Sequence, residues 1–415
     1  MSNHEIVHEI ASFMMANASC SSTFMSDKGA TGVRDRSHIV WTEFAEDERK
    51  KIQTNEIALP WTTSTAPTAI RRVIGHYGIL QQIGKGSTSK VYEAADLSED
   101  PPRRVGTSNS SGILFIPSNI QWLRLIAAVK LLDKLWLEQQ RIMGIGSTTS
   151  ALDQVYRGIK IQQIAQQHEN IVQLFEVIEN VGTEQNKMCL VSEFMDEGPL
   201  VSSTELKLRP NSATLTSARK TMLPLDLETG YIFCQQLLEA LNHLHKKFIS
   251  HRDVKPENCL VTSGKKLSLS DFGSAVIYED SDPYTTETPG TLLFAAPECL
   301  QGENSHCPFL TDVWAAGLVM CLIFFDSIPI ARNEEIPELS EYDVICRIRK
   351  LDDSSVQTWI QNRFQESRTV GVGSAGDPQY SKSMEDLLAR LLCVDPAKRT
   401  SARDALVQLA FIDTT

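Results

Sequence analysis

The sequence lacks the cysteine pairs and the long apolar runs that mark several classes of protein. None of its nine cysteines forms a Cys-x-x-Cys pair, and the two closest, Cys299 and Cys307, are eight residues apart. This spacing disfavours a zinc site or a disulfide framework and favours free thiols in a reducing compartment. The longest apolar stretch, Trp314 to Phe325, is too short to span a bilayer, so we expect a buried helix there.

Positive charge is scarce, and no secretory signal is recognisable. The chain carries 40 Lys and Arg against 52 Asp and Glu, which gives a formal net charge of -12. Such a chain repels nucleic acid and anionic membranes in bulk, so neither is expected as a partner. The first 20 residues carry acids and histidine and show no clean apolar run. We therefore expect a soluble protein of the cytoplasm or the nucleus.

What the sequence does contain is a series of strand patterns followed by helix patterns. Its 415 residues, 42% of them hydrophobic, are enough for a two-lobed enzyme core with extensions. Residues 1–75 are rich in Ser and Thr and poorly periodic, so we predict a disordered N-terminal extension with some local helix. The strand patterns cover residues 79–93, where a glycine turn separates two strands, and residues 126–131, 171–177 and 188–193.

This order of patterns predicts an α+β fold with two lobes. A small strand-rich N-terminal lobe with one main helix is expected at about 76–194, and a larger, mainly helical C-terminal lobe at about 195–412. Residues 97–121 and 202–222 are polar and rich in turn-forming residues, so they are predicted to be surface insertions. Residues 132–149 are predicted to be another loop.

The main helix of the N-terminal lobe is expected to begin next to Ser150. Ser150 and Asp153 have the spacing of a capping box, in which each side chain bonds the backbone N–H of the other residue. Apolar residues then recur with helical spacing on one face, at Leu152, Val155, Tyr156 and Ile159.

A glycine-rich turn joins the first two predicted strands. It reads Ile83-Gly84-Lys85-Gly86-Ser87-Thr88-Ser89-Lys90-Val91, and glycine lets backbone N–H groups approach a phosphate closely. Glycine turns between strands are common, so this pattern alone is weak. The next strand contains Ala128 and ends near Lys130, whose ammonium could reach the phosphates of a nucleotide. Lys130 gains its significance from following the turn, because a lone lysine in a strand is normally only solvated.

The strongest pattern is His251-Arg252-Asp253-Val254-Lys255-Pro256-Glu257-Asn258. Asp253 can accept the proton of a substrate hydroxyl, and Lys255 can neutralise a phosphoryl group in transfer. Asn258 offers a hard oxygen ligand of the kind that Mg²⁺ prefers. These three roles together are the requirements of phosphoryl transfer.

A second metal-binding pattern follows at a fixed separation. Asp271-Phe272-Gly273 begins thirteen residues after Asn258, and Asp271 is the second candidate ligand for magnesium. Residues 259–261 and 266–270 are predicted to form a small hairpin, which would bring the two ligands together. The two motifs at this separation form a specific joint signature.

These motifs resemble those of eukaryotic protein kinases over residues about 78–412, and Lys255 is typical of the serine/threonine type. The resemblance implies a bilobal protein-kinase-like fold, ATP and Mg²⁺ as cofactors, and a protein substrate. It assigns Asp253, Lys255 and Lys130 to catalysis, and Asn258 and Asp271 to the metal. The nucleotide-binding residues that it implies are Ile83, Gly84, Lys85, Gly86, Ser87, Val91, Ala128, Lys130, Glu193, Met195, Asn258 and Asp271, with Ser192 as the residue behind the adenine.

The same resemblance implies several contacts around the site. Asp312 would brace the loop that carries Asp253, and Thr291 would contact both Asp253 and Lys255. Glu298, at the end of residues 290–298, would pair with Arg399.

Residues 274–295 would be the activation loop of the kinase. Its candidate phosphorylation sites, expected to face Arg252, are Thr285, Thr286 and Thr288. If a phosphate on Thr288 pairs with Arg252, Thr288→Ala should reduce activity and leave ATP affinity nearly unchanged.

A narrower resemblance is to calcium/calmodulin-dependent protein kinase kinases, which phosphorylate the activation loops of other kinases, including AMP-activated kinase. It rests on residues 152–156, 193–199, 288–291 and 312–317. The chain ends at Thr415, just after the last expected helix, so no calmodulin-binding tail is expected and calmodulin is not a predicted partner.

One residue that an active kinase should have is missing. The resemblance places a glutamate that pairs with Lys130 near Gly158, yet no glutamate lies between Glu138 and Glu169. Asp153 precedes Gly158 by five residues and lies on another face of the helix, so we expect it to cap the helix instead.

Three functions remain open from the sequence. The first is an active serine/threonine kinase, and the second is a pseudokinase scaffold that binds nucleotide without efficient catalysis. The third is a small-molecule phosphotransferase, which residues 290–298 disfavour because the resemblance assigns that segment to a protein substrate.

Overall fold

The structure is a computed structural model of the chain. It describes residues 40–43, 72–75, 77–85, 89–96, 126–144, 147–179, 186–201, 225–279, 283–287, 290–300, 305–332, 339–370 and 378–413. Both predicted insertions, 97–121 and 202–222, lie outside the described residues.

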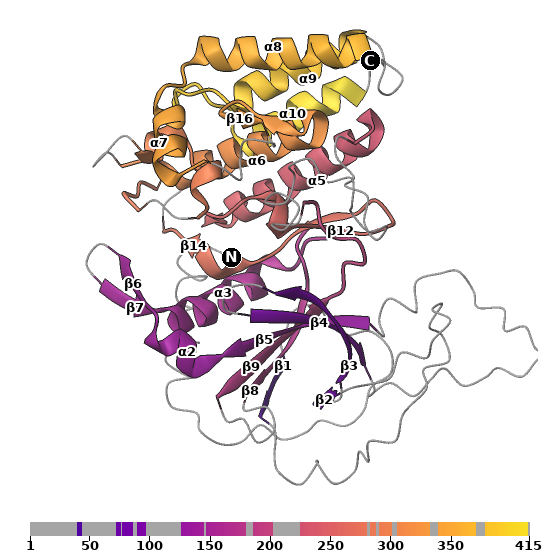
Figure 1. The fold of residues 1–415 in the computed structure, drawn as a ribbon, viewed down its shortest axis with the longest axis vertical. Coiled ribbons are helices and arrows are strands. Elements are labelled where there is room, and N and C mark those ends of the chain that lie inside the picture. Colours follow the sequence, from indigo (N-terminus) through magenta and orange to yellow (C-terminus); the bar gives the residue numbers. More distant parts are fainter. Residues whose placement is uncertain are drawn as a thin grey trace, which may run out of the picture.

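The N-terminal lobe is built on a seven-stranded sheet with the order β1-β8-β9-β5-β4-β3-β2 (Figure 1). Neighbouring strands pair antiparallel except at β1. The strands other than β1 are β2 (Arg72–Ile74), β3 (Tyr77–Lys85), β4 (Ser89–Asp96), β5 (Ile126–Asp133), β8 (Leu174–Glu179) and β9 (Lys187–Glu193).

The predicted strands correspond to observed ones, with one shift of boundary. The strand predicted at 171–177 begins at Leu174 instead, and Ile171 forms an isolated bridge to Leu269 in the other lobe. Ile171 is therefore part of the connection between the lobes, since its backbone pairs away from the N-terminal sheet.

The edge strand β1 (Val40–Glu43) corrects the prediction that residues 1–75 are a disordered extension. β1 pairs parallel with β8, with Val40 opposite Glu176, and β2 pairs with β3 within the same sheet. Valine, tryptophan and threonine favour extended backbone, and the edge of β8 offers unpaired backbone groups to a further strand. The remainder of residues 1–71 lies outside the described residues, and the predicted local helix is not among the described elements.

The stretch 132–149, predicted to be a loop, forms regular structure. After the end of β5 it contains the helix α2 (Lys134–Gln139) and a hairpin of β6 (Arg141–Gly144) with β7 (Ser147–Ser150). Asp133 caps α2 by accepting a hydrogen bond of 3.0 Å from the backbone of Trp136. The prediction was wrong because a helix of six residues is too short to show a helical period in the sequence.

The main helix of the N-terminal lobe, α3 (Ala151–Ala165), begins as predicted. Ser150 Oγ accepts from Asp153 N at 3.1 Å, and Asp153 Oδ2 accepts from Ser150 N at 2.9 Å, so the capping box is confirmed. The helix packs on one face of the sheet through an apolar cluster that contains Ile159, Leu174, Val177 and Met188.

The C-terminal lobe is a group of helices around one large apolar core (Figure 1). Its helices are α5 (Leu227–Lys246), α6 (Pro308–Phe325), α7 (Glu341–Arg349), α8 (Asp353–Val370), α9 (Pro378–Leu391) and α10 (Ala402–Asp413). Together with the strand-rich N-terminal lobe, they confirm the predicted bilobal α+β fold.

The helix α6 is the apolar segment that was predicted to be buried. It starts at Pro308, earlier than expected, and over its 18 residues it is long and apolar enough to cross a membrane by length and composition. However, 78% of that window is buried inside the fold, and Trp314 is among the largest fully buried side chains. α6 is therefore the central core helix of the C-terminal lobe.

Several short strands of the C-terminal lobe pair with one another around the two sequence motifs. The hairpin of β12 (Cys259–Val261) and β13 (Leu267–Leu269) forms as predicted, and β10 (Gly198–Pro199) pairs with β12. β11 (Ile249–Ser250) pairs with β14 (Val276–Ile277), on either side of the two sequence motifs. All cysteines among the described residues are free thiols, as expected.

Candidate active site

Asp312 of α6 holds the loop that carries the first motif. Its Oδ2 accepts hydrogen bonds of 2.9 Å from both His251 N and Ser250 Oγ, and its Oδ1 accepts one of 2.8 Å from Arg252 N. Burial alone raises the pKa of Asp312, but the hydrogen bond and charge of His245 and the backbone donor lower it overall. An ionised carboxylate therefore fixes the backbone on both sides of His251, which agrees with the implied bracing contact.

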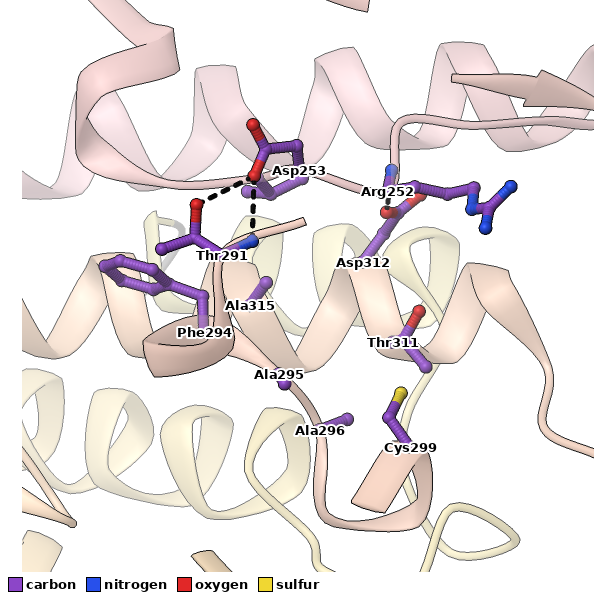
Figure 2. A pocket seen from close by; sticks show the side chains of 11 residues that line it. Arg252, Asp253, Thr291, Phe294, Ala295, Ala296, Cys299, Thr311, Asp312 and Ala315 are labelled. Atoms are coloured by element: carbon purple, nitrogen blue, oxygen red, sulfur yellow. Dashed lines mark hydrogen bonds between the residues drawn. The ribbon is translucent and has the colours of Figure 1, made fainter. Parts of the chain in front are cut away.

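Asp253 is held by donors on both of its carboxylate oxygens. Thr291 donates to Oδ1 from its backbone N and from its hydroxyl, each at 3.1 Å (Figure 2). Lys255 Nζ lies 2.8 Å from Oδ2, and Asn258 Nδ2 donates to Oδ2 at 3.1 Å. Lys255 also donates to the Thr291 hydroxyl at 2.8 Å, so both contacts implied for Thr291 are present. The carboxylate thus has one orientation, set by three neighbours.

The close approach of Thr291 to Asp253 depends on the preceding glycine. Gly290 has a φ of +82°, a left-handed conformation that side chains disfavour. A Cβ at this position would lie 2.5 Å from the carbonyl oxygen of Arg252. Only glycine therefore lets the segment that begins at Gly290 lie against the loop that carries Asp253.

The β12–β13 hairpin brings the two candidate metal ligands to neighbouring positions. Cys259 pairs with Leu269, and Ser270 N donates to Asn258 O at 2.9 Å, so Asn258 and Asp271 flank adjacent ends of the hairpin. Asp271 has a φ of 63° and caps the short helix η4 (Phe272–Ser274) by accepting from Gly273 N at 3.3 Å. The predicted proximity follows from the predicted hairpin.

Lys130 of the N-terminal lobe pairs with Asp271 of the C-terminal lobe. Lys130 lies in β5 with Val91 of β4 and Leu190 of β9 directly beside it, and its Nζ is 3.3 Å from Asp271 Oδ2. The charge of the Lys130 ammonium lowers the pKa of Asp271 to about 2. The aspartate is therefore ionised at neutral pH and available to a cation.

The donor atoms near Asp271 fit a divalent cation that also binds phosphates. The hydrogen bonds of the Asn258 side chain run through its nitrogen Nδ2, which leaves the oxygen Oδ1 as its ligand atom. Within the described ranges, no cluster of three or more His, Cys, Asp or Glu side chains could hold a metal by itself. A cation bound to Asn258 and Asp271 would therefore complete its shell with phosphate oxygens and water, as Mg²⁺ does.

Several candidate nucleotide residues of the sheet lie on the neighbouring strands β3 and β4. Gly84 pairs with Val91, and Ile83 is 40% exposed at the end of β3. Lys85 pairs with Lys90 and is exposed. The turn residues Gly86 and Ser87 lie outside the described residues.

The connection between the lobes carries the remaining candidate residues. Ala128 of β5 lies opposite Ser192 of β9, and the Glu193 carboxylate pairs with Lys266 of the C-terminal lobe at 2.6 Å. Met195 is buried, and its carbonyl accepts from Gly198 N at 2.9 Å. The segment that would face an adenine is thus fastened at both ends.

A buried ion pair supports the segment that follows Thr291. Arg399 donates to both oxygens of Glu298, at 2.5 and 2.9 Å, and its guanidinium lies 5.0 Å from the ring centre of Trp314. The side chain of Arg399 is fully buried and that of Glu298 is 9% exposed. This pair confirms the contact that the resemblance implied.

A small cavity separates this segment from the loop that carries Asp253 (Figure 2). Its volume is about 30 Å³, room for roughly one water molecule. Cys299 lines it, and burial raises the pKa of this thiol to about 12, so the sulfur stays protonated. Asp253 and Thr291 line it as well, so the cavity adjoins the carboxylate of the candidate site.

Part of the predicted activation loop is fastened to the C-terminal lobe. Thr285 and His306 exchange two backbone hydrogen bonds of 2.9 Å each. Arg252, predicted to face a phosphothreonine, donates a hydrogen bond of 2.7 Å to Glu287. Thr286 is exposed, and Thr288 lies outside the described residues.

Two contacts at the candidate site were missed in the sequence. Glu287 precedes Thr288 directly, so an acid beside a candidate phosphorylation site was the available signal. The other contact is that of Gly158 with the backbone of Phe272: an ideal Cβ at Gly158 would lie 2.8 Å from the Phe272 carbonyl oxygen. No sequence signal identified this contact, because it depends on how closely α3 approaches η4.

Comparison with known proteins identifies similar chains. A model described as the protein kinase domain matches residues 125–411. Cyclin-dependent kinase 4 of Xenopus laevis is 33% identical over 248 residues, which cover 59% of this chain and 72% of that protein. Serine/threonine-protein kinase TOS3 of Saccharomyces cerevisiae is 23% identical over 387 residues, 90% of this chain and 59% of that protein.

A third similar protein is SNF1-activating kinase 1 of Saccharomyces cerevisiae, 26% identical over 380 residues. The match covers 85% of this chain and 29% of that protein. The chain thus spans most of the frog kinase but only part of the two yeast kinases. The matched range of the domain begins at residue 125, so β2, β3 and β4 precede it.

Proposed function

The chain belongs to the protein kinase family, and from this premise we propose that it transfers the γ-phosphate of ATP to serine and threonine hydroxyls of proteins. One observation carries the proposal: Asp253 is held between Thr291, Lys255 and Asn258 by hydrogen bonds and an ion pair of 2.8 to 3.1 Å. A carboxylate held in this way can receive a hydroxyl proton at a defined place.

The chemistry requires a nucleophile, a proton acceptor and charge neutralisation. The substrate hydroxyl oxygen attacks the γ-phosphorus, the bond from that phosphorus to the bridging oxygen breaks, and ADP leaves. The hydroxyl proton passes to Asp253, and the ammonium of Lys255, 2.8 Å from Asp253, balances charge on the phosphoryl group. Lys130 would hold the α- and β-phosphates from β5.

The protein kinase family uses ATP with a divalent metal, and we propose Mg²⁺ as that metal. Asn258 and Asp271 would hold it through side-chain oxygens, and the lowered pKa of Asp271 keeps that carboxylate ionised at neutral pH. The ion would neutralise phosphate charge during transfer. Ile83, Gly84, Lys85, Gly86, Ser87, Val91, Ala128, Glu193 and Met195 are proposed to surround the nucleotide.

The experiment that tests this function uses the full chain, Mg²⁺, labelled ATP and a generic protein substrate. Asp253→Asn keeps the shape of the side chain and removes its basicity, so label incorporation should fall by about two orders of magnitude or more. Incorporation that persists in Asp253→Asn would show a contaminating kinase. A wild-type chain that binds MgATP without incorporating label would contradict the proposal.

We propose further that the substrates include the activation loops of other kinases. SNF1-activating kinase 1 is by its name a kinase that activates another protein, SNF1, and the similarity to it covers 85% of this chain. The resemblance to calcium/calmodulin-dependent protein kinase kinases points to the same substrate class. Phosphorylation of a catalytically dead kinase by wild-type chain, mapped to its activation loop, would support this. Label confined to other sites would contradict it.

A second candidate function is that of a nucleotide-binding pseudokinase. The observation that favours it is Gly158, where α3 offers no carboxylate to Lys130. Against it, the acidic partner of Lys130 within the described ranges is Asp271, and Asp253 and Asn258 are both present. The labelled-ATP experiment separates the two functions, because both bind nucleotide but only the enzyme transfers phosphate.

A further inference from the structure

The helix α3 approaches the Asp271–Gly273 segment more closely than a side chain would permit. A Cβ on Gly158 would lie 2.8 Å from the carbonyl oxygen of Phe272 and 3.0 Å from its carbonyl carbon. Both are backbone atoms, which cannot swing aside as the end of a side chain can. Gly158 is buried, so this contact is internal to the fold. The backbones of α3 and η4 therefore touch without a side chain between them.

Hydrogen bonds at other points hold α3 in this position. Tyr156 Oη donates to Glu179 of β8 at 3.1 Å, and Lys134 of α2 binds the other oxygen of that carboxylate at 2.7 Å. One turn after Gly158, Gln162 Nε2 donates to the carbonyl oxygen of Val172 at 2.9 Å. These bonds attach the first half of α3 to the sheet and its second half to the segment before β8.

The end of α3 is attached to the C-terminal lobe. His243 of α5 has its Nε2 2.9 Å from the carbonyl oxygen of Ala165, the last residue of α3. None of these anchoring bonds involves Lys130. The position of α3 is thus determined at three places along its length without an ion pair to the lysine of β5.

Lys130 pairs with a carboxylate of the C-terminal lobe. The one acid within α3 is Asp153, and its carboxylate bonds Ser150 in the capping box. In the described part of the chain, the carboxylate that pairs with Lys130 is that of Asp271, at 3.3 Å. The other oxygen of Asp271 accepts from Gly273 N, so the pair depends on the conformation of η4.

We propose that Gly158 is a positioning residue: its direct contact with Phe272 fixes η4, so that Asp271 takes over the role of orienting Lys130 that a carboxylate on α3 would otherwise have. The absence of a glutamate from α3 is then not a loss of function, because an ion pair of Lys130 with Asp271 replaces the ion pair with α3. Gln162 supports the arrangement by holding α3 at the required depth. The kinetic part of this inference rests on the proposed function, whereas its structural part does not.

The test compares Gly158→Ala, Gly158→Glu and wild type, with Arg157→Glu as the matched control. Arg157 is exposed and adjacent, so Arg157→Glu adds a carboxylate to the same helix without touching η4. Helix propensity alone predicts that Gly158→Ala raises the melting temperature. Contact with the Phe272 backbone predicts the opposite, a lower melting temperature and faster amide hydrogen exchange over residues 272–274. A higher melting temperature, or unchanged exchange, would overturn the contact.

The kinetics decide whether phosphate transfer by this chain would be faster with a carboxylate on α3. We expect kcat/KM for ATP to fall by about tenfold or more in both Gly158 variants and to stay within about twofold in Arg157→Glu. If the kcat of Gly158→Glu instead exceeds that of wild type, Asp271 does not replace the glutamate of α3, and the inference is wrong. If Gly158→Glu does not fold, the kinetics of Gly158→Ala are compared with those of wild type and Arg157→Glu instead. If wild type transfers no phosphate, the proposed function fails, while exchange over residues 272–274 still decides the structural part.

Discussion

Arg252 and Glu287 form an ion pair of 2.7 Å in which the arginine side chain is 7% exposed and the glutamate 47%. Arg252 is the residue that was expected to face a phosphothreonine of the activation loop. The loop thus supplies its own anion to Arg252, and the two backbone bonds between Thr285 and His306 hold the same stretch against the C-terminal lobe.

The first prediction concerns this pair. Glu287→Ala should lower kcat about three- to fivefold, because a partly exposed ion pair contributes up to about 1 kcal/mol. Glu279→Ala, which removes an exposed acid from the same segment, should leave kcat unchanged. The single variant Thr288→Ala should have little effect on kcat, because the carboxylate of Glu287 already pairs with Arg252. A large loss in Thr288→Ala, with none in Glu287→Ala, would show that phosphate is the anion that matters.

The second prediction concerns the hydroxyl of Thr291. Thr291→Val removes the bonds from this hydroxyl to Asp253 and from Lys255 to it, while the backbone donor to Asp253 remains. We expect kcat to fall about tenfold, the equivalent of roughly 1.4 kcal/mol, with the KM for ATP nearly constant. Thr291→Ser retains the hydroxyl and should retain most activity. A loss in Thr291→Ser with none in Thr291→Val would point to packing of the methyl group instead.

The third prediction concerns the buried pair of Glu298 and Arg399. Arg399→Met leaves a buried carboxylate without its partner, which should destabilise the chain by about 3–5 kcal/mol in urea unfolding. The double variant Glu298→Gln with Arg399→Met removes the charge as well and should recover part of that loss. A double variant as unstable as the sum of both single changes would mean that the two side chains act independently.

The fourth prediction is a dependence of stability on pH. The pKa of Asp271 is lowered to about 2 in the folded chain. Its pairing with Lys130 therefore stabilises the fold above pH of about 4, the usual value in an unfolded chain, and this contribution is lost as pH falls toward about 2. Lys130→Met should be less stable than wild type at neutral pH, and the difference should shrink below pH of about 4. The measurement is urea unfolding across this range.

Lys350→Met, at an exposed position in the helical lobe, is the control for the pH series. Its difference from wild type should not vary across the window where Asp271 titrates. A Lys130→Met difference that stays constant from neutral pH to about 2 would show that Lys130 acts through packing of its stem and not through its charge.

Contacts within or between the motifs could be predicted from the sequence, whereas contacts set by packing depth could not. Ser150 and Asp153 lie on one turn of helix, so their spacing alone predicts the capping box that is observed. The hairpin that carries Asn258 and Asp271 likewise follows from local patterns. The contact of Gly158 with Phe272 depends on how closely α3 approaches η4, and no local pattern encodes that depth.

The errors in the predicted fold have related causes. α2 and the β6–β7 hairpin are too short for periodicity to show in the sequence. The strand at Val40–Glu43 is recruited by the open edge of β8, more than 130 residues further along the chain. Intrinsic propensity indicates which conformations a segment can adopt. The pairing partner that selects one of them can lie far away in the sequence, so a local pattern does not reveal it.

The glycine at position 158 also changes what a small molecule bound beside α3 would meet. A ligand that reaches α3 with an N–H group would find no carboxylate from that helix to accept its hydrogen bond, because Asp153, the one acid of α3, is engaged at the helix start. Compounds whose affinity depends on such an acceptor should bind this chain weakly. Compounds that instead insert apolar groups between α3 and η4 would have to push apart two backbones that are already in contact, so they should bind this chain weakly for a steric reason.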